Sequence, residues 1–161
     1  MIIAKIEIEP AVAEYVLGKY YDAGIGAVKF PPSSEMYITI YNLMAKRPAD
    51  KPVDSGNLPI ALPDRRAANE AGGKDPQIYN YLSARAAAII GSRLSVMMWA
   101  ELHERLDEDK HLRGIRYKDS VFEFMQKYGI ESITEDALLK NYQRWRDKIR
   151  RRLKRGYTKK Q

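Results

Sequence analysis

All eight prolines of this 161-residue chain lie within its first 76 residues, and none follows Pro76. Proline removes a backbone donor and clashes with the preceding turn, so it interrupts helix interiors. The proline-free segment from residue 77 to residue 161 can therefore form long helices, whereas the first part of the chain must form shorter elements. The sequence thus predicts an α+β fold in which helices predominate and the strands lie near the N-terminus.

A small sheet is predicted from three segments of the N-terminal part. Apolar and polar residues alternate over Ile2–Glu9, which is typical of a strand with one buried face. Ala27–Phe30 follows a glycine-containing turn and has the composition of a second strand. Asn57–Leu62 forms a third candidate, and Pro59 and Pro63 are expected to confine it to an edge of the sheet.

Two short helices are expected to pack with this sheet. Pro10 can occupy the first position of a helix over Ala11–Tyr21, where its missing donor costs nothing. Ser33 or Ser34 can cap a second helix over Ser34–Lys46. The β propensity within this second segment leaves a strand over residues 37–41 as an alternative.

One long central helix, Pro76–Leu106, is predicted to follow. Asp75 is a suitable N-cap, and Pro76 suits the first helical position. Apolar residues then recur at helical spacing for about eight turns. Gly91 within the helix indicates a closely packed neighbour, because a mid-helix glycine costs about 1 kcal/mol relative to alanine. The segment Asp107–Gly114 is expected to end the helix.

Two further helices are predicted in the last third of the chain. Gly129 is placed to end a helix over Lys118–Lys127, and either Ser132 or Thr134 can cap the next one. The second helix carries an apolar stripe that is expected to be its buried face: Leu138, Tyr142, Trp145, Ile149 and Leu153. A short helix, a glycine-bearing turn and a basic helix resemble the helix-turn-helix DNA readers over Lys118–Arg152, with a turn about two residues longer.

The predicted organisation therefore has four parts. A small α+β part covers residues 1–66, a loop covers 67–75, a helical part covers 76–155, and a flexible tail covers 156–161. The helical part contains the long central helix and the C-terminal helical pair.

The positive charge of the chain is concentrated at its C-terminal end. Residues 140–161 hold eleven of the 28 basic residues and only one acidic residue, Asp147. The other residues carry 17 basic and 20 acidic side chains, a net charge of −3. Such asymmetry indicates an element that faces a polyanion.

The last helix is predicted to carry this function. At 100° per residue, Lys140, Arg144 and Arg151 form a ridge opposite the apolar stripe, with Lys148 beside them. Arg150 and Arg152 flank the stripe. We expect six cations of this helix to contact phosphates: Lys140, Arg144, Lys148, Arg151, Arg152 and Arg155. Glu135 and Asp136 place negative charge at the start of the helix, and Asp147 lies on the basic face. These acids favour contact along the length of the helix or at its C-terminal half over insertion of its N-terminus. Asn141 and Gln143, at the edges of the ridge, are the candidate base readers.

Other chemistry finds little support in the sequence. The absence of cysteine excludes disulfides, thiol catalysis and cysteine-ligated zinc. His103 and Asp107 share a helix face, as metal ligands can, but nothing supplies the remaining ligands, and the acidic run around them is expected to be solvated. No catalytic set, nucleotide-binding loop, metal site or cofactor is therefore predicted, and no enzymatic activity.

We predict a small cytoplasmic nucleic-acid-binding accessory or regulatory protein, with double-stranded DNA favoured over RNA. No apolar run is long enough for integral membrane insertion, and the N-terminus lacks the pattern of a secretory signal. Two alternatives stay open. The apolar stripe can pair with a partner subunit, which would make the chain an assembly module or a homo-oligomer. A basic amphipathic helix also suits anionic lipid.

Overall fold

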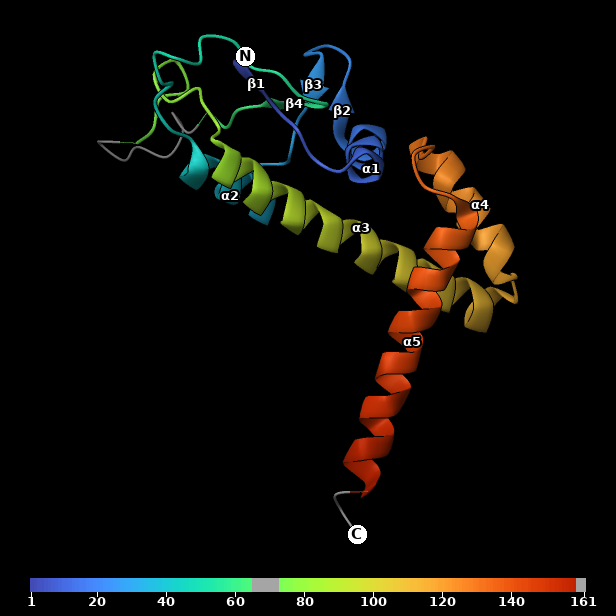
Figure 1. Cartoon of the computed structure of the whole chain (residues 1–161). Helices are drawn as coiled ribbons and strands as arrows, with labels where there is room; N and C mark the ends of the chain where they lie inside the picture. The colour runs from blue at the N-terminus through green and yellow to red at the C-terminus, as the bar shows by residue number, and fades with distance from the viewer. Residues whose placement is uncertain (65–72, 159–161) are drawn as a thin grey trace. The chain divides into compact units, whose positions relative to one another are not determined.

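The computed structural model describes residues 1–64 and 73–158, which form five helices and four strands and so confirm the α+β, predominantly helical fold (Figure 1). The elements in chain order are β1 (Ile3–Ile6), α1 (Pro10–Tyr20), β2 (Tyr21–Asp22), β3 (Ala27–Val28), α2 (Glu35–Leu43), β4 (Leu58–Ala61), α3 (Ala84–Arg113), α4 (Tyr117–Tyr128) and α5 (Glu135–Thr158). The chain divides into two compact units, Met1–Met98 and Trp99–Gln161, and the division falls within α3.

The predicted four-part organisation stays a prediction. Most of the expected loop at 67–75 lies outside the described residues, and so does the end of the expected tail. Helix α5 continues to Thr158, three residues beyond the end predicted for the helical part.

Local signals place the N-terminal elements correctly. Pro10 occupies the first turn of α1, and the side chain of Ser34 accepts a hydrogen bond from the Tyr37 amide at the start of α2. The alternative strand over residues 37–41 is therefore wrong. In β1, Ala4 and Ile6 are buried and their neighbours Ile3 and Lys5 are exposed, as the alternation predicts.

The sheet has the order β1-β4-β3-β2, which contradicts the predicted edge position of β4. β4 pairs antiparallel with β1 and parallel with β3. The Leu62 amide donates to the Ile2 carbonyl, so by antiparallel alternation the ring nitrogen of Pro59 faces away from β1. On the other side, β3 pairs with β4 only at Val28 and Ile60. The donor that Pro59 lacks is therefore not needed for the short ladder.

The long helix begins and ends later than predicted. The Asp75 carbonyl accepts bonds from Ile78 and Tyr79, but this turn does not continue. Tyr81 instead forms an extended bridge with Ala45. The hydroxyl of Ser83 then accepts the Ala86 amide and caps α3.

The predicted break over residues 107–114 is also wrong, because α3 continues to Arg113. Asp109 lies one turn from both Arg105 and Arg113, and ion pairs join it to each of them. Pairs at this spacing stabilise a helix. Gly114, with φ of 64°, follows the last residue of α3.

Gly91 confirms the predicted close contact in unit 1. A Cβ atom at this position would lie 3.1 Å from Cγ2 of the buried Ile8. We expect Gly91→Leu to lower the free energy of unfolding by about 1–3 kcal/mol, because the added side chain would overpack this contact. Urea unfolding followed by circular dichroism measures the change. Gly91→Leu should lower stability less in a chain that already carries Ile8→Ala, because the shorter side chain leaves room for leucine. A Gly91→Leu variant as stable as the parent would contradict the prediction.

Candidate nucleic-acid interface

The turn between α4 and α5 has defined caps at both ends. Gly129 adopts the left-handed conformation with φ of 67°, and its amide donates to the Met125 carbonyl. Thr134 Oγ1 accepts a hydrogen bond of 3.2 Å from the Ala137 amide, so Thr134 is the N-cap of α5. The 24 residues of α5 extend for about 36 Å at 1.5 Å per residue.

The first half of α5 packs within unit 2. Leu138 and Tyr142 are fully buried. The Tyr142 hydroxyl donates a hydrogen bond to Asp107, and Arg146 donates one to the Tyr117 hydroxyl. Burial and the bond to Asp107 raise the pKa of the Tyr142 phenol, which therefore stays neutral. These contacts anchor α5 on one side as far as Arg146.

His103 of α3 also contacts this half of α5. Its Nε2 lies 2.9 Å from Asn141 Oδ1, and its ring stacks on Trp145 with the centroids 4.5 Å apart. The side-chain oxygen of Asn141 is thus engaged inside the unit, and of the two candidate base readers only Gln143 is exposed. In the described part of the chain, no three His, Asp or Glu side chains converge where a metal ion could bind.

The burial of His103 makes the stability of unit 2 depend on pH. Desolvation lowers its pKa from the ordinary value of 6.5, although the Asn141 bond and the charge of Asp107 oppose this. The neutral ring therefore stabilises the folded state above pH 6.5, and this contribution is lost as the pH falls from 6.5 through the lower pKa of the folded state. We expect the urea midpoint to fall between pH 7 and pH 5, and to fall less in His103→Gln. Tryptophan fluorescence measures the urea midpoint at each pH. The same dependence of the midpoint on pH in the parent and in His103→Gln would contradict the prediction.

The second half of α5 is exposed, and here the predicted buried stripe is wrong. Every residue from Asp147 to Gly156 is exposed, including Ile149 at 36% and Leu153 at 69%. Figure 1 shows this part of α5 running past the end of its packing against α4. We call residues 147–156 the free half of α5, a name that refers to the exposure of all ten residues and not to their ion pairs. The stripe is buried only where α3 and α4 lie alongside it.

The six predicted phosphate contacts are all exposed. Lys140 and Arg144 lie on the packed half, and the other four lie on the free half: Lys148, Arg151, Arg152 and Arg155. Within the described residues, none of the six forms an ion pair with a carboxylate. All but Arg152 fall within an arc of about 80° at 100° per residue, and these five are called the cationic ridge. The ridge extends about 22 Å along the helix.

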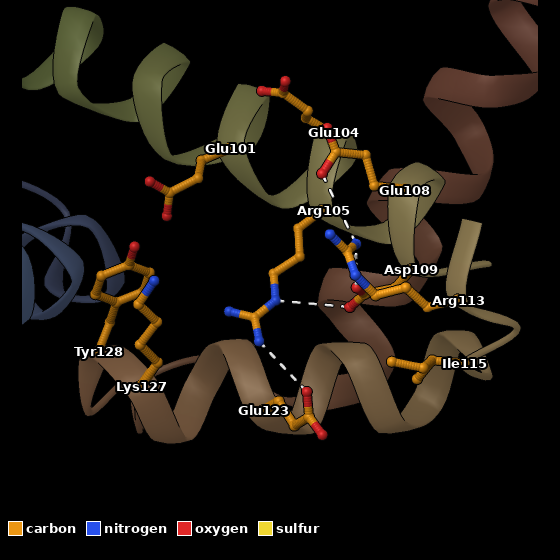
Figure 2. Close-up of a pocket in the computed structure, with 10 residues that line it drawn as sticks. All are labelled: Glu101, Glu104, Arg105, Glu108, Asp109, Arg113, Ile115, Glu123, Lys127 and Tyr128. Atoms are coloured by element: carbon orange, nitrogen blue, oxygen red, sulfur yellow. Dashed lines mark hydrogen bonds and ion pairs between the residues drawn. The ribbon is translucent and has the colours of Figure 1, made fainter. Parts of the chain in front are cut away.

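The acidic run of α3 is less solvated than predicted. With residues of α4, it lines a groove of about 560 Å³ (Figure 2). Arg105 crosses this groove and pairs with Asp109 of α3 and Glu123 of α4. Asp109 is only 5% exposed, and it accepts a hydrogen bond from the Ser120 hydroxyl at 2.9 Å. Opposite charges therefore join α3 to α4, a role that the sequence alone did not reveal.

The chain matches no protein-family model, no curated protein and no solved structure. The interpretation of the candidate site therefore depends on the chemistry of its own residues. None of the helices in residues 1–64 and 73–158 combines the length and the apolar content needed to cross a bilayer.

Proposed function

We propose that this chain is a nucleic-acid-binding accessory or regulatory protein that holds the phosphate backbone of double-stranded DNA with α5. The observation that supports the proposal is the exposure of Lys140, Arg144, Lys148, Arg151, Arg152 and Arg155, without a carboxylate partner for any of them in the described residues. Cations that are already paired within the protein would gain little from a phosphate. Unpaired cations gain a charge-assisted hydrogen bond and release counterions from the DNA.

The geometry of α5 supports contact through its C-terminal half. Glu135 and Asp136 occupy the first turn, where they repel phosphate. The free half carries six basic residues and one acidic residue, and all ten of its residues are exposed. A helix is about 10–12 Å wide, and the major groove of B-form DNA is about 12 Å wide, so the free half can approach phosphates on both walls.

Retention assays test the proposal with three probes: a DNA duplex, single-stranded RNA, and vesicles of phosphatidylcholine and phosphatidylserine. We expect retention on the duplex that falls roughly 10³-fold between 50 and 200 mM salt if six phosphates are contacted. Stronger retention on RNA than on the duplex would identify RNA, and not DNA, as the partner. Retention on the vesicles alone would contradict nucleic-acid binding and favour a lipid surface.

Assembly with a partner subunit is a second candidate function. The exposure of Ile149 and Leu153 favours it, because these residues extend the buried stripe into solvent. Light scattering after size exclusion tests this candidate. A dimer that becomes a monomer in Ile149→Ser/Leu153→Ser would support assembly through α5, whereas a monomer at all concentrations would contradict self-assembly.

A further inference from the structure

Within residues 140–155, the length of the cationic ridge, one carboxylate lies on the cationic face of α5. Asp147 is exposed at the start of the free half. At 100° per residue it is about 20° from Lys140 and about 40° from Arg151 around the helix. Asp147 would therefore face the same ligand as these cations.

Helix stabilisation does not explain this carboxylate. Asp147 precedes Arg150 by three residues and Arg151 by four, the spacings at which ion pairs form on a helix surface. Yet across residues 1–64 and 73–158, no ion pair or hydrogen bond engages its side chain. The carboxylate is thus available to a ligand.

Phosphate binding does not explain it either. A carboxylate has only acceptor oxygens and repels phosphate, so on this face it weakens binding to any backbone. It can, however, accept a hydrogen bond from the amino group of a base. In the major groove, cytosine presents such a donor at N4, and aspartate is a suitable acceptor for it. The minor groove is about 6 Å wide, which is too narrow for a helix.

We propose that Asp147 is a specificity-determining residue that accepts a hydrogen bond from the N4 amino group of a cytosine in the major groove. The inference rests on the proposed binding of duplex DNA by α5. Cations on either side of Asp147, such as Lys140 and Arg151, neutralise phosphates and position the helix. Asp147 then reads one base pair, because cytosine donates a hydrogen bond to its carboxylate. Guanine and thymine present an acceptor or a methyl group instead, and adenine presents the N7 acceptor beside its N6 amino group.

Selection from a pool of randomised duplexes tests the inference with the full chain and three variants. The parent is expected to select a fixed C·G pair. Asp147→Ala should lose that pair and bind random duplex more tightly, because a negative charge has been removed. Asp147→Asn should prefer A·T at the same position, because an amide pairs with adenine N6 and N7. A cytosine-to-thymine change should weaken parental binding roughly 5- to 100-fold and leave Asp147→Ala unaffected.

Asp136→Asn is the matched control, since Asp136 is an exposed acid of the same helix that lies three turns earlier. It should select the same C·G pair as the parent. Selection of that pair by Asp147→Ala would overturn the inference, and so would salt-dependent retention of duplex without any selected base. In both cases the proposed function would still stand, whereas failure to retain any duplex would contradict the proposed function itself.

Discussion

Replacing Arg144 and Arg151 by alanine is expected to weaken binding to duplex DNA of every sequence and to lower the salt slope by about two. Both side chains are exposed on the cationic ridge, one on the packed half of α5 and one on the free half. If six phosphates are contacted, the loss of two contacts should reduce the change in affinity between 50 and 200 mM salt from about 10³-fold to about 10²-fold. Fluorescence anisotropy with a labelled duplex at several salt concentrations measures the slope.

Arg85→Ala/Lys118→Ala provides the matched control for this experiment. These two cations are exposed on α3 and α4, outside the ridge, and their removal changes the net charge equally. The control should leave the salt slope near the parental value. An unchanged slope in Arg144→Ala/Arg151→Ala would contradict phosphate binding by the ridge and favour the assembly candidate. An equal loss of affinity and of salt slope in both double variants would indicate that binding depends only on the net charge of the protein.

Replacing Asp109 by alanine is expected to lower the free energy of unfolding of unit 2 by about 2–4 kcal/mol. Its carboxylate is buried and accepts bonds from Ser120 and from Arg113 Nη1, the latter at 3.0 Å. Alanine would leave the buried Ser120 hydroxyl without this partner and would remove the ion pair with Arg105. Urea unfolding followed by tryptophan fluorescence reports on this unit, because it contains both tryptophans of the chain.

Glu108→Ala separates the effect of burial from that of charge. Glu108 also pairs with Arg113, at 3.9 Å, but its side chain is 48% exposed. An exposed pair contributes little, so this control should lower stability by less than about 1 kcal/mol. Similar losses in Asp109→Ala and Glu108→Ala would show that the contact with Ser120 does not stabilise unit 2.

The elements that could be predicted are those whose signals are local. Pro10, Ser34 and Gly129 each act on the turn in which they lie, and each is found at the predicted helix end. Asp75 has an equally good local signal, but pairing between Tyr81 and Ala45 takes precedence over it. The central position of β4 likewise depends on the pairing of distant strands, which its own prolines could not reveal.

The candidate site shows the same division. Helical spacing alone predicts that the ridge cations lie opposite Leu138 and Tyr142, and the structure places them on the exposed side. The same spacing cannot show how far the neighbouring helices extend. For this reason Ile149 and Leu153 were wrongly expected to be buried. The engagement of Asn141 by His103 also depends on a partner 38 residues away.

The exposure of all ten residues from 147 to 156 makes this segment accessible to a protease. It contains Lys and Arg at six of its ten positions, and every one of them is a cleavage site for trypsin. Local opening there disrupts little tertiary packing, because every residue of the segment is exposed. Repulsion between cations one turn apart, such as Lys148 and Arg152, favours this opening. Brief digestion should therefore shorten the chain from this end first, while the rest of unit 2 stays folded.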